Sequence, residues 1–282
     1  MKTEDKSKRA ETVGEYENVP EDINYYVENS RMAQQPEVTL WDFIDNRPDL
    51  EYIKFCEETG ADLTTEIDAS QLLLGTLPGI KEENFYEWCM NNQHTCMKKY
   101  YERRPYHKGI NEFTLDLPMK CGYNHRNTCD YNWGLYGDSN EQLKELIGGK
   151  EAFDLIGLDY DTTLCRLLVY MPGQVLPMHY DYLGGWCREN SQLNPNMEKQ
   201  VCDLGPIKRH LLMVSDWHWG HALQFANSWF PKWKAGEIYN LPIPIYHTST
   251  NFGLKLKITL SLSGVQTHES KLPDGTFNAL SY

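Results

Sequence analysis

Three side chains that could share one metal ion are spread over the second half of the sequence. His179 and Asp181 stand one residue apart in MPGQVLPMHYDYLGGW, and His247 follows in IPIYHTSTNFG. In an extended strand, residues i and i+2 point to the same face, so the imidazole and the carboxylate can converge. Two imidazoles and one carboxylate on one octahedral face are typical of a non-haem Fe(II) site with open positions. The spacing therefore predicts metal chemistry.

A buried cation is expected beside this site. In LKLKITLSLSG, strand alternation separates a polar face from an aliphatic face; the polar residues are Lys255, Lys257, Thr259 and Ser261. A lysine buried without a partner is costly, so it favours an anion. Lys257 and Thr259 lie ten and twelve residues after His247. They could together bind the far carboxylate of a dicarboxylic co-substrate whose other end chelates iron.

Three further residues could reach the same space. Tyr170 could donate a hydrogen bond to the co-substrate, although a tyrosine of the core would have the same sequence signal. Arg209 shares a strand face with Leu211; it would bind a carboxylate if it faces a barrel interior, or remain solvated at a strand end. His221 could lie on the inner wall and contact the co-substrate, or simply begin the next strand.

A rival metal set lies in SDWHWGHALQF, where Asp216, His218 and His221 occur close together. Asp216 and His218 would share a strand face, but His221 follows Gly220 and lies beyond an easily shared point. We therefore prefer the set formed by His179, Asp181 and His247. The sequence has neither a G-x-S-x-G nucleophile elbow nor a phosphate-binding glycine loop.

The elements that would position these residues change in type along the chain. Before residue 161 the periodicity is mostly helical, with helices predicted over 40–60, 78–105 and 139–149. After residue 161, short segments rich in β-formers alternate with Pro, Gly and Asn; they span 163–173, 208–217, 221–229, 237–244 and 254–264. We expect an α+β fold, mainly β in its C-terminal half, in which helices pack against a sandwich or barrel.

The expected domain plan follows from these changes. Residues 1–36 are polar and are predicted to form a flexible arm, and residues 37–282 a single domain. Within it, 37–160 would be the helical part, 161–265 the β core and 266–282 a C-terminal tail. The polar stretch 187–206 is predicted to be a surface loop that acts as a lid beside the site.

Composition restricts the class of protein further. The 282 residues carry a net charge of −13, which disfavours nucleic acid as a partner. No apolar run is long enough to span a bilayer and the N-terminus has no secretory pattern, so a soluble, cytoplasmic protein is expected. The eight cysteines are scattered without a C-x-x-C pair, and we interpret them mostly as reduced thiols. The oligomeric state cannot be read from the sequence.

The pattern His179-x-Asp181, then His247, then Lys257-x-Thr259 resembles the signature of the Fe(II)/2-oxoglutarate-dependent oxygenases. That family commonly has arginine and serine where this chain has lysine and threonine, and lysine holds a carboxylate less rigidly. The wider stretch 161–264 is similar to cupin-like members of the aspartyl/asparaginyl β-hydroxylase type. The resemblance implies a double-stranded β-helix of the jelly-roll or cupin type, buttressed by the N-terminal helices.

The resemblance also implies an activity. Fe(II) would be held by His179, Asp181 and His247, and 2-oxoglutarate by the iron and Lys257 with help from Thr259, while O2 is consumed. The expected outcome is hydroxylation of an unactivated C–H bond in a small polar metabolite such as an amino acid, with release of succinate and CO2. The alternatives are a protein side-chain hydroxylase, a non-catalytic cupin-like binding module, and a metal-dependent isomerase or hydrolase that uses no co-substrate.

Overall fold

The computed structural model describes most of the second half of the chain and part of the first. The residues described are 44–47, 49–51, 53–54, 67–103, 132–133, 138–179, 207–241, 245 and 247–273, all within one compact unit, Thr39–Tyr282. At some of these positions, including 93–103 and 177–179, only the backbone is described. Asp181 and the predicted lid at 187–206 lie outside the described residues.

In the described part of the chain, helical positions between 44 and 54 and three longer helices precede the β core. Helix α5 (Glu82–Arg103) and helix α7 (Asp138–Leu146) lie in segments with predicted helical periodicity. Helix α8 (Gly149–Ile156) was not predicted; it ends at Gly157, whose positive φ of 85° lets its N–H bond to the carbonyl of Phe153. A short 3-10 turn, η2 (Ala69–Leu72), leads into the first strand.

The strands form two antiparallel sheets. The six-stranded sheet has the order β1-β8-β5-β10-β3-β2 and the four-stranded sheet the order β4-β9-β6-β7. The strand bounds, in chain order, are β1 (Leu73–Thr76), β2 (Asn132–Trp133), β3 (Leu164–Tyr170), β4 (Gln174–His179), β5 (Ile207–Met213), β6 (His221–Phe225), β7 (Ser228–Trp229), β8 (Glu237–Asn240), β9 (His247–Asn251) and β10 (Lys257–Val265).

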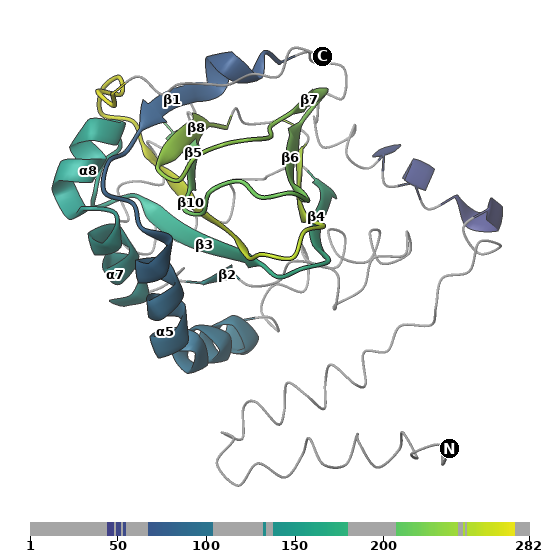
Figure 1. Ribbon diagram of the computed structural model, residues 1–282, viewed down its shortest axis with the longest axis horizontal. Coiled ribbons are helices and arrows are strands. Elements are labelled where there is room, and N and C mark those ends of the chain that lie inside the picture. Colours follow the sequence, from purple (N-terminus) through teal and green to yellow (C-terminus); the bar gives the residue numbers. More distant parts are fainter. Residues whose placement is uncertain are drawn as a thin grey trace, which may run out of the picture. The chain divides into compact units, whose positions relative to one another are not determined.

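From β3 onward the chain passes back and forth between the two sheets. Strands β3, β5, β8 and β10 belong to the larger sheet, while β4, β6, β7 and β9 belong to the smaller one. This winding is that of a double-stranded β-helix, and Figure 1 shows the two sets of strands on opposite sides of a common interior. The α+β class and the double-stranded β-helix are thus present, as two open sheets rather than a closed barrel.

The helices cover the outer face of the six-stranded sheet. Phe85, Leu143 and Phe153 from the three helices are buried in one cluster with Leu260 and Leu262 of β10. Burying an aliphatic or aromatic side chain of this size contributes about 1.5–3 kcal/mol, so this layer is the main apolar core. Because the aliphatic face of β10 is used here, its alternate residues must face the interior between the sheets.

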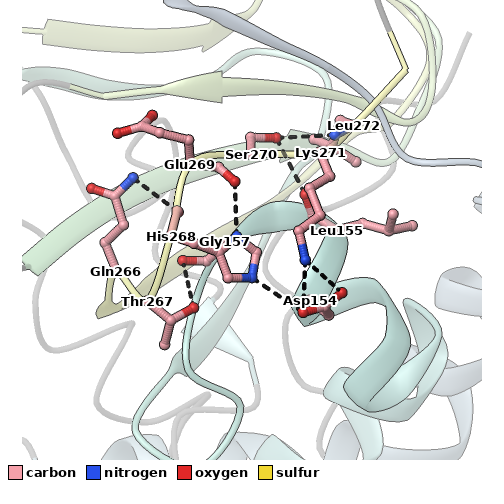
Figure 2. A network of polar contacts seen from close by, with 10 residues as sticks. All are labelled: Asp154, Leu155, Gly157, Gln266, Thr267, His268, Glu269, Ser270, Lys271 and Leu272. Carbon is pink, nitrogen blue, oxygen red and sulfur yellow. Dashed lines mark hydrogen bonds and ion pairs between the residues drawn. The ribbon is translucent and has the colours of Figure 1, made fainter.

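Residues 266–273, the described part of the expected C-terminal tail, pack against α8. The N–H groups of Thr267 and Lys271 donate to the carbonyls of Gly157 and Leu155, at 2.9 and 2.8 Å. The side chains of His268 and Lys271 both reach Asp154, as Figure 2 shows. The N–H of Thr76 in β1 then bonds to Pro273. The beginning of the expected tail therefore joins the helical layer to an edge strand.

The five predicted β segments are confirmed by β3, β5, β6 with β7, β8 and β10. Four strands were not predicted: β4 and β9 of the smaller sheet, and β1 and β2 at the edges of the larger one. The edge strands come from the region expected to be helical, so 37–160 contributes to the sheet as well as covering it.

Candidate active site

The structure brings His179 and His247 together at the backbone level. His179 ends β4, His247 begins β9, and the two are Cα partners across the antiparallel pair. An irregularity in the register between Leu176 and His179 bends β4 just before this pair. The side chain of His179 and the whole of Asp181 lie outside what the structure describes. The predicted trio therefore stays a prediction, and strand register supports the proximity of two of its members, His179 and His247.

The imidazole of His247 is buried and oriented. Only 6% of the residue is exposed, and its ring stacks on Phe225 with centroids 4.9 Å apart and planes 10° apart. Nδ1 lies 2.9 Å from the carbonyl oxygen of Ile245, which can only accept, so Nδ1 carries a proton. In the neutral ring the lone pair is then on Nε2. Metal-binding histidines are typically oriented by such a hydrogen bond on the other nitrogen.

Lys257 points into the interior and connects the two sheets. The residue is fully buried, and its Nζ donates to the carbonyl of Ala222 at 2.5 Å, to Ser249 Oγ at 2.7 Å and to the carbonyl of Thr250 at 3.3 Å. Nζ also lies 4.9 Å from the ring centroid of Tyr170. These three oxygens are uncharged, and the Ser249 hydroxyl can rotate away, so a carboxylate could take its place.

Thr259 follows Lys257 on the same inner face of β10. It is 1% exposed, and within the described part of the structure its Oγ1 has no hydrogen-bond partner. Leaving a buried hydroxyl unsatisfied costs about 1–3 kcal/mol. A lone hydroxyl beside an ammonium group fits the oxygens of an anionic ligand. The donors at this position are compatible with a carboxylate, and its binding there stays a prediction.

Tyr170 and Arg209 also face the interior. Tyr170 is fully buried, and its backbone carbonyl accepts from Asn251 Nδ2 at 2.9 Å. Arg209 is 8% exposed and its Nε donates to Ser261 Oγ at 3.2 Å. Burial, assisted by the charge of Arg166, lowers the pKa of Arg209 to about 9. Their roles toward a co-substrate stay predictions.

His221 is held by the backbone at both ring nitrogens. Nδ1 accepts from the N–H of His218 at 3.3 Å, and Nε2 contacts the carbonyl of Lys255 at 3.1 Å. The ring also stacks on Trp233. Burial lowers the pKa of His221 to about 4, assisted by the charge of Lys257, so the ring is neutral at pH 7. These contacts support a structural role for His221 rather than the expected co-substrate contact.

The rival trio does not assemble into a metal site. Asp216, His218 and His221 are all described, yet no group of three His, Cys, Asp or Glu side chains within the described ranges is placed to hold a metal ion. Asp216 Oδ1 instead accepts from the N–H of Ala235 at 2.9 Å. His221 is used as above.

Two polar residues of β9 escaped the sequence analysis. Ser249 accepts from Lys257, while Asn251 Nδ2 donates to the carbonyls of Tyr170 and Lys255 and so joins the ends of β9 and β3 to the turn before β10. The signal was present in the composition of HTSTN, a segment of five polar residues that is buried throughout. A run of polar residues predicts a loop when the hydrogen-bond partners that would allow its burial are not known.

Comparisons with known proteins add little. No family model and no curated protein matches the sequence. A Cupin 2 conserved barrel domain protein from Salinispora arenicola is 12% identical over 36% of this chain and 63% of its own, with a TM-score of 0.24. An RmlC-like cupin family protein from Methanocaldococcus jannaschii is 13% identical, over 37% and 72%, at 0.24. A non-heme monooxygenase, the ThoJ–Ni complex, is 11% identical, over 52% and 68%, at 0.31.

Identities and TM-scores this low establish neither a family nor a function, and the match spans less than two thirds of the Salinispora chain. The fold assignment therefore rests on the strand order of the two sheets. None of the helices in the described ranges has the length and apolar character needed to cross a membrane.

Proposed function

We propose that this protein is an Fe(II)- and 2-oxoglutarate-dependent oxygenase that hydroxylates a small polar metabolite such as an amino acid. The observation that carries the proposal is the pairing of His179 with His247 on the four-stranded sheet, with buried Lys257 reaching β9 from the six-stranded sheet. This arrangement supports a metal at one end of a ligand and a cation at the other.

In this proposal His179, Asp181 and His247 would hold the iron. Bound iron would supply oxygen activation coupled to decarboxylation, so that substrate, 2-oxoglutarate and O2 become hydroxylated substrate, succinate and CO2. Phe225 keeps the imidazole of His247 in place by stacking, and the carbonyl of Ile245 holds its proton on Nδ1. These contacts present Nε2 as the donor atom.

Lys257 and Thr259 would bind the far carboxylate of 2-oxoglutarate. Ser249 lies two residues after His247 on β9, so the acceptor that Lys257 now uses is about 7 Å along the strand from His247. A five-carbon dicarboxylate is of comparable length. The low polarity around Lys257 strengthens its attraction for an anion, and Thr259 Oγ1 would gain a partner.

The experiment is succinate formation from 2-oxoglutarate by purified protein with Fe(II) under air, with a library of metabolites as candidate substrates. Lys257→Met should raise the KM for 2-oxoglutarate by about 10- to 100-fold because a hydrogen bond to a charged group contributes about 1.5–3 kcal/mol. Lys271→Met is the matched control, since Lys271 is half-exposed and pairs with Asp154. An isomerase or hydrolase without co-substrate would form no succinate, and a binding module would turn nothing over.

A further inference from the structure

The inner face of the six-stranded sheet carries a second cationic position. Arg209 on β5 and Arg166 on β3 belong to alternate positions that face the interior, as Leu211 and Leu168 do on the same two strands. Ser261 of β10 lies between these strands: it is the Cα partner of Arg166 and of Leu211. Its hydroxyl accepts from Arg209. The Arg209 guanidinium therefore contacts Ser261, and Arg166 is the strand neighbour of the same serine, close enough for its charge to act on Arg209.

This position is separate from Lys257. Lys257 and Ser261 are four positions apart on β10, which corresponds to about 13 Å along the strand. Arg209 itself is the Cα partner of Ser263, which lies two residues beyond Ser261 and so still further from Lys257. A single five-carbon dicarboxylate held between His247 and Lys257 would not also need Arg209. The two cations are thus placed to bind two different anions.

Burial disfavours the charged form of Arg209, so its guanidinium group is stabilised by acceptors and negative charges. The residue is more than nine-tenths buried, and the charge of Arg166 acts against it. An arginine fork matches a carboxylate in two parallel hydrogen bonds, and low polarity strengthens them. An anion between the two arginines would relieve their repulsion.

We propose that Arg209, with Arg166 and Ser261, binds a carboxylate of the substrate itself. The inference rests on the proposed function, because it assumes that the bound compound is the substrate of the oxygenase. It narrows the substrate class to compounds with a free carboxylate, such as free α-amino acids. A residue within a polypeptide has no free α-carboxylate. The arginine position therefore favours a free amino acid over a neutral protein side chain, such as that of an asparagine residue.

The first test needs no turnover. Thermal unfolding of the metal-free protein is followed with millimolar L-amino acids and with the matching L-amino acid amides, because a ligand of the folded state raises Tm. We expect at least one acid to raise the Tm and its amide to do so much less. Arg209→Gln should abolish that difference, while Arg47→Gln, which alters an exposed arginine paired with Asp49, should keep it.

A second variant protects this test against misfolding. Ser261→Ala leaves both charges in place and removes only the hydroxyl partner, so it should weaken the acid-dependent shift without abolishing it. Equal shifts by acids and amides in the wild type would overturn the proposal. So would an acid-dependent shift that survives in Arg209→Gln but disappears in Lys257→Met, because the carboxylate would then sit at Lys257.

The second test uses turnover once a stimulating compound is known. The ratio of succinate formation with the acid to that with its amide should exceed about 10-fold in wild type and approach 1 in Arg209→Gln. Lys257→Met should keep the high ratio while its overall rate falls. Stimulation by peptides alone would contradict the inference. If wild type forms no succinate at all, the proposed function fails, and the Tm measurements still decide the arginine site.

Discussion

Two strands of the four-stranded sheet begin with a buried histidine, and the ring nitrogens of the two histidines have different partners. His221 begins β6 and His247 begins β9, and because these strands are antiparallel, the two lie at opposite ends of the sheet. Each ring stacks on an aromatic ring, Trp233 or Phe225. His221 gives both ring nitrogens to the backbone, whereas the backbone contact of His247 involves Nδ1.

The difference separates a histidine that builds a turn from one that is prepared to donate. At the His221 end, Gly220 adopts φ of 93° and its backbone lies directly against Gly253, so a side chain at either position would collide with the other turn. His221 ties these two turns together. At the His247 end the neighbouring strand supplies His179 instead. Burial alone would not distinguish the two histidines, but their hydrogen bonds do.

The largest expected effect comes from making the same substitution, histidine to asparagine, separately at each end of the sheet. His247→Asn should reduce 2-oxoglutarate turnover to background because a metal ligand is lost. His221→Asn should retain turnover in the folded protein but lower the free energy of unfolding by about 1–3 kcal/mol, because it loses two hydrogen bonds and a stacking contact. Succinate assays and urea unfolding measure both effects. Turnover lost in His221→Asn and kept in His247→Asn would reverse our assignment.

A smaller effect is expected at Thr259, where the fold and the ligand have opposite requirements. Thr259→Val replaces an unpartnered buried hydroxyl with a methyl group of similar size. The free energy of unfolding of the ligand-free protein should therefore stay the same or rise, while the KM for 2-oxoglutarate rises about 5-fold through loss of about 1 kcal/mol. The control is Thr267→Val: Thr267 is exposed and its hydroxyl donates to the carbonyl of Gly157, so this substitution should lower stability slightly and leave the KM unchanged. A clear loss of stability without a change in KM would contradict this role.

The smallest effect is a pH dependence of stability. The pKa of His221 is about 4 in the folded protein and near 6.5 when unfolded, so acidification between these values protonates the unfolded chain preferentially. Stability is therefore fully present above pH 6.5 and is lost as pH falls, by at most about 1.4 kcal/mol per pH unit for one histidine. His210, whose pKa burial also lowers to about 4, contributes in the same direction.

Urea unfolding between pH 6.5 and 5 checks this prediction. His221→Asn should show a shallower loss of stability with acidification than wild type, while the remainder reflects His210 and other groups. The carboxylates with lowered pKa values, such as Asp154, titrate below this range and do not obscure it. Identical pH slopes in wild type and His221→Asn would show that the ring of His221 is not kept neutral by the fold.

Much of the fold could be predicted because most strands have a local sequence pattern that is typical of β structure. In β10, aliphatic and polar residues alternate, and the structure buries Ile258 and Leu260 against the helices while Lys257 faces inward. The strand β9 could not be predicted this way, because all five of its residues are polar and all are buried. Its polar groups are satisfied by distant partners, such as Leu176 for Thr248, which local periodicity does not report.

The candidate site was predictable in type more than in detail. Spacing pointed to Lys257 and Thr259, and the structure places both inside the β-helix. The same spacing could not say that the ring of His221 bonds to the backbone, because its partners, His218 and Lys255, come from two separate turns. Nor could it say whether Arg209 ends a strand or faces inward; its contact with Ser261 decides this.

The most direct measurement is an anaerobic titration of the protein with Fe(II) and 2-oxoglutarate, followed by visible absorption. Wild type and His221→Asn should develop the weak charge-transfer band of iron chelated by the co-substrate, with one iron per chain, and His247→Asn should not. Absence of the band in wild type, or its full retention in His247→Asn, would contradict the metal site on which the proposed function depends.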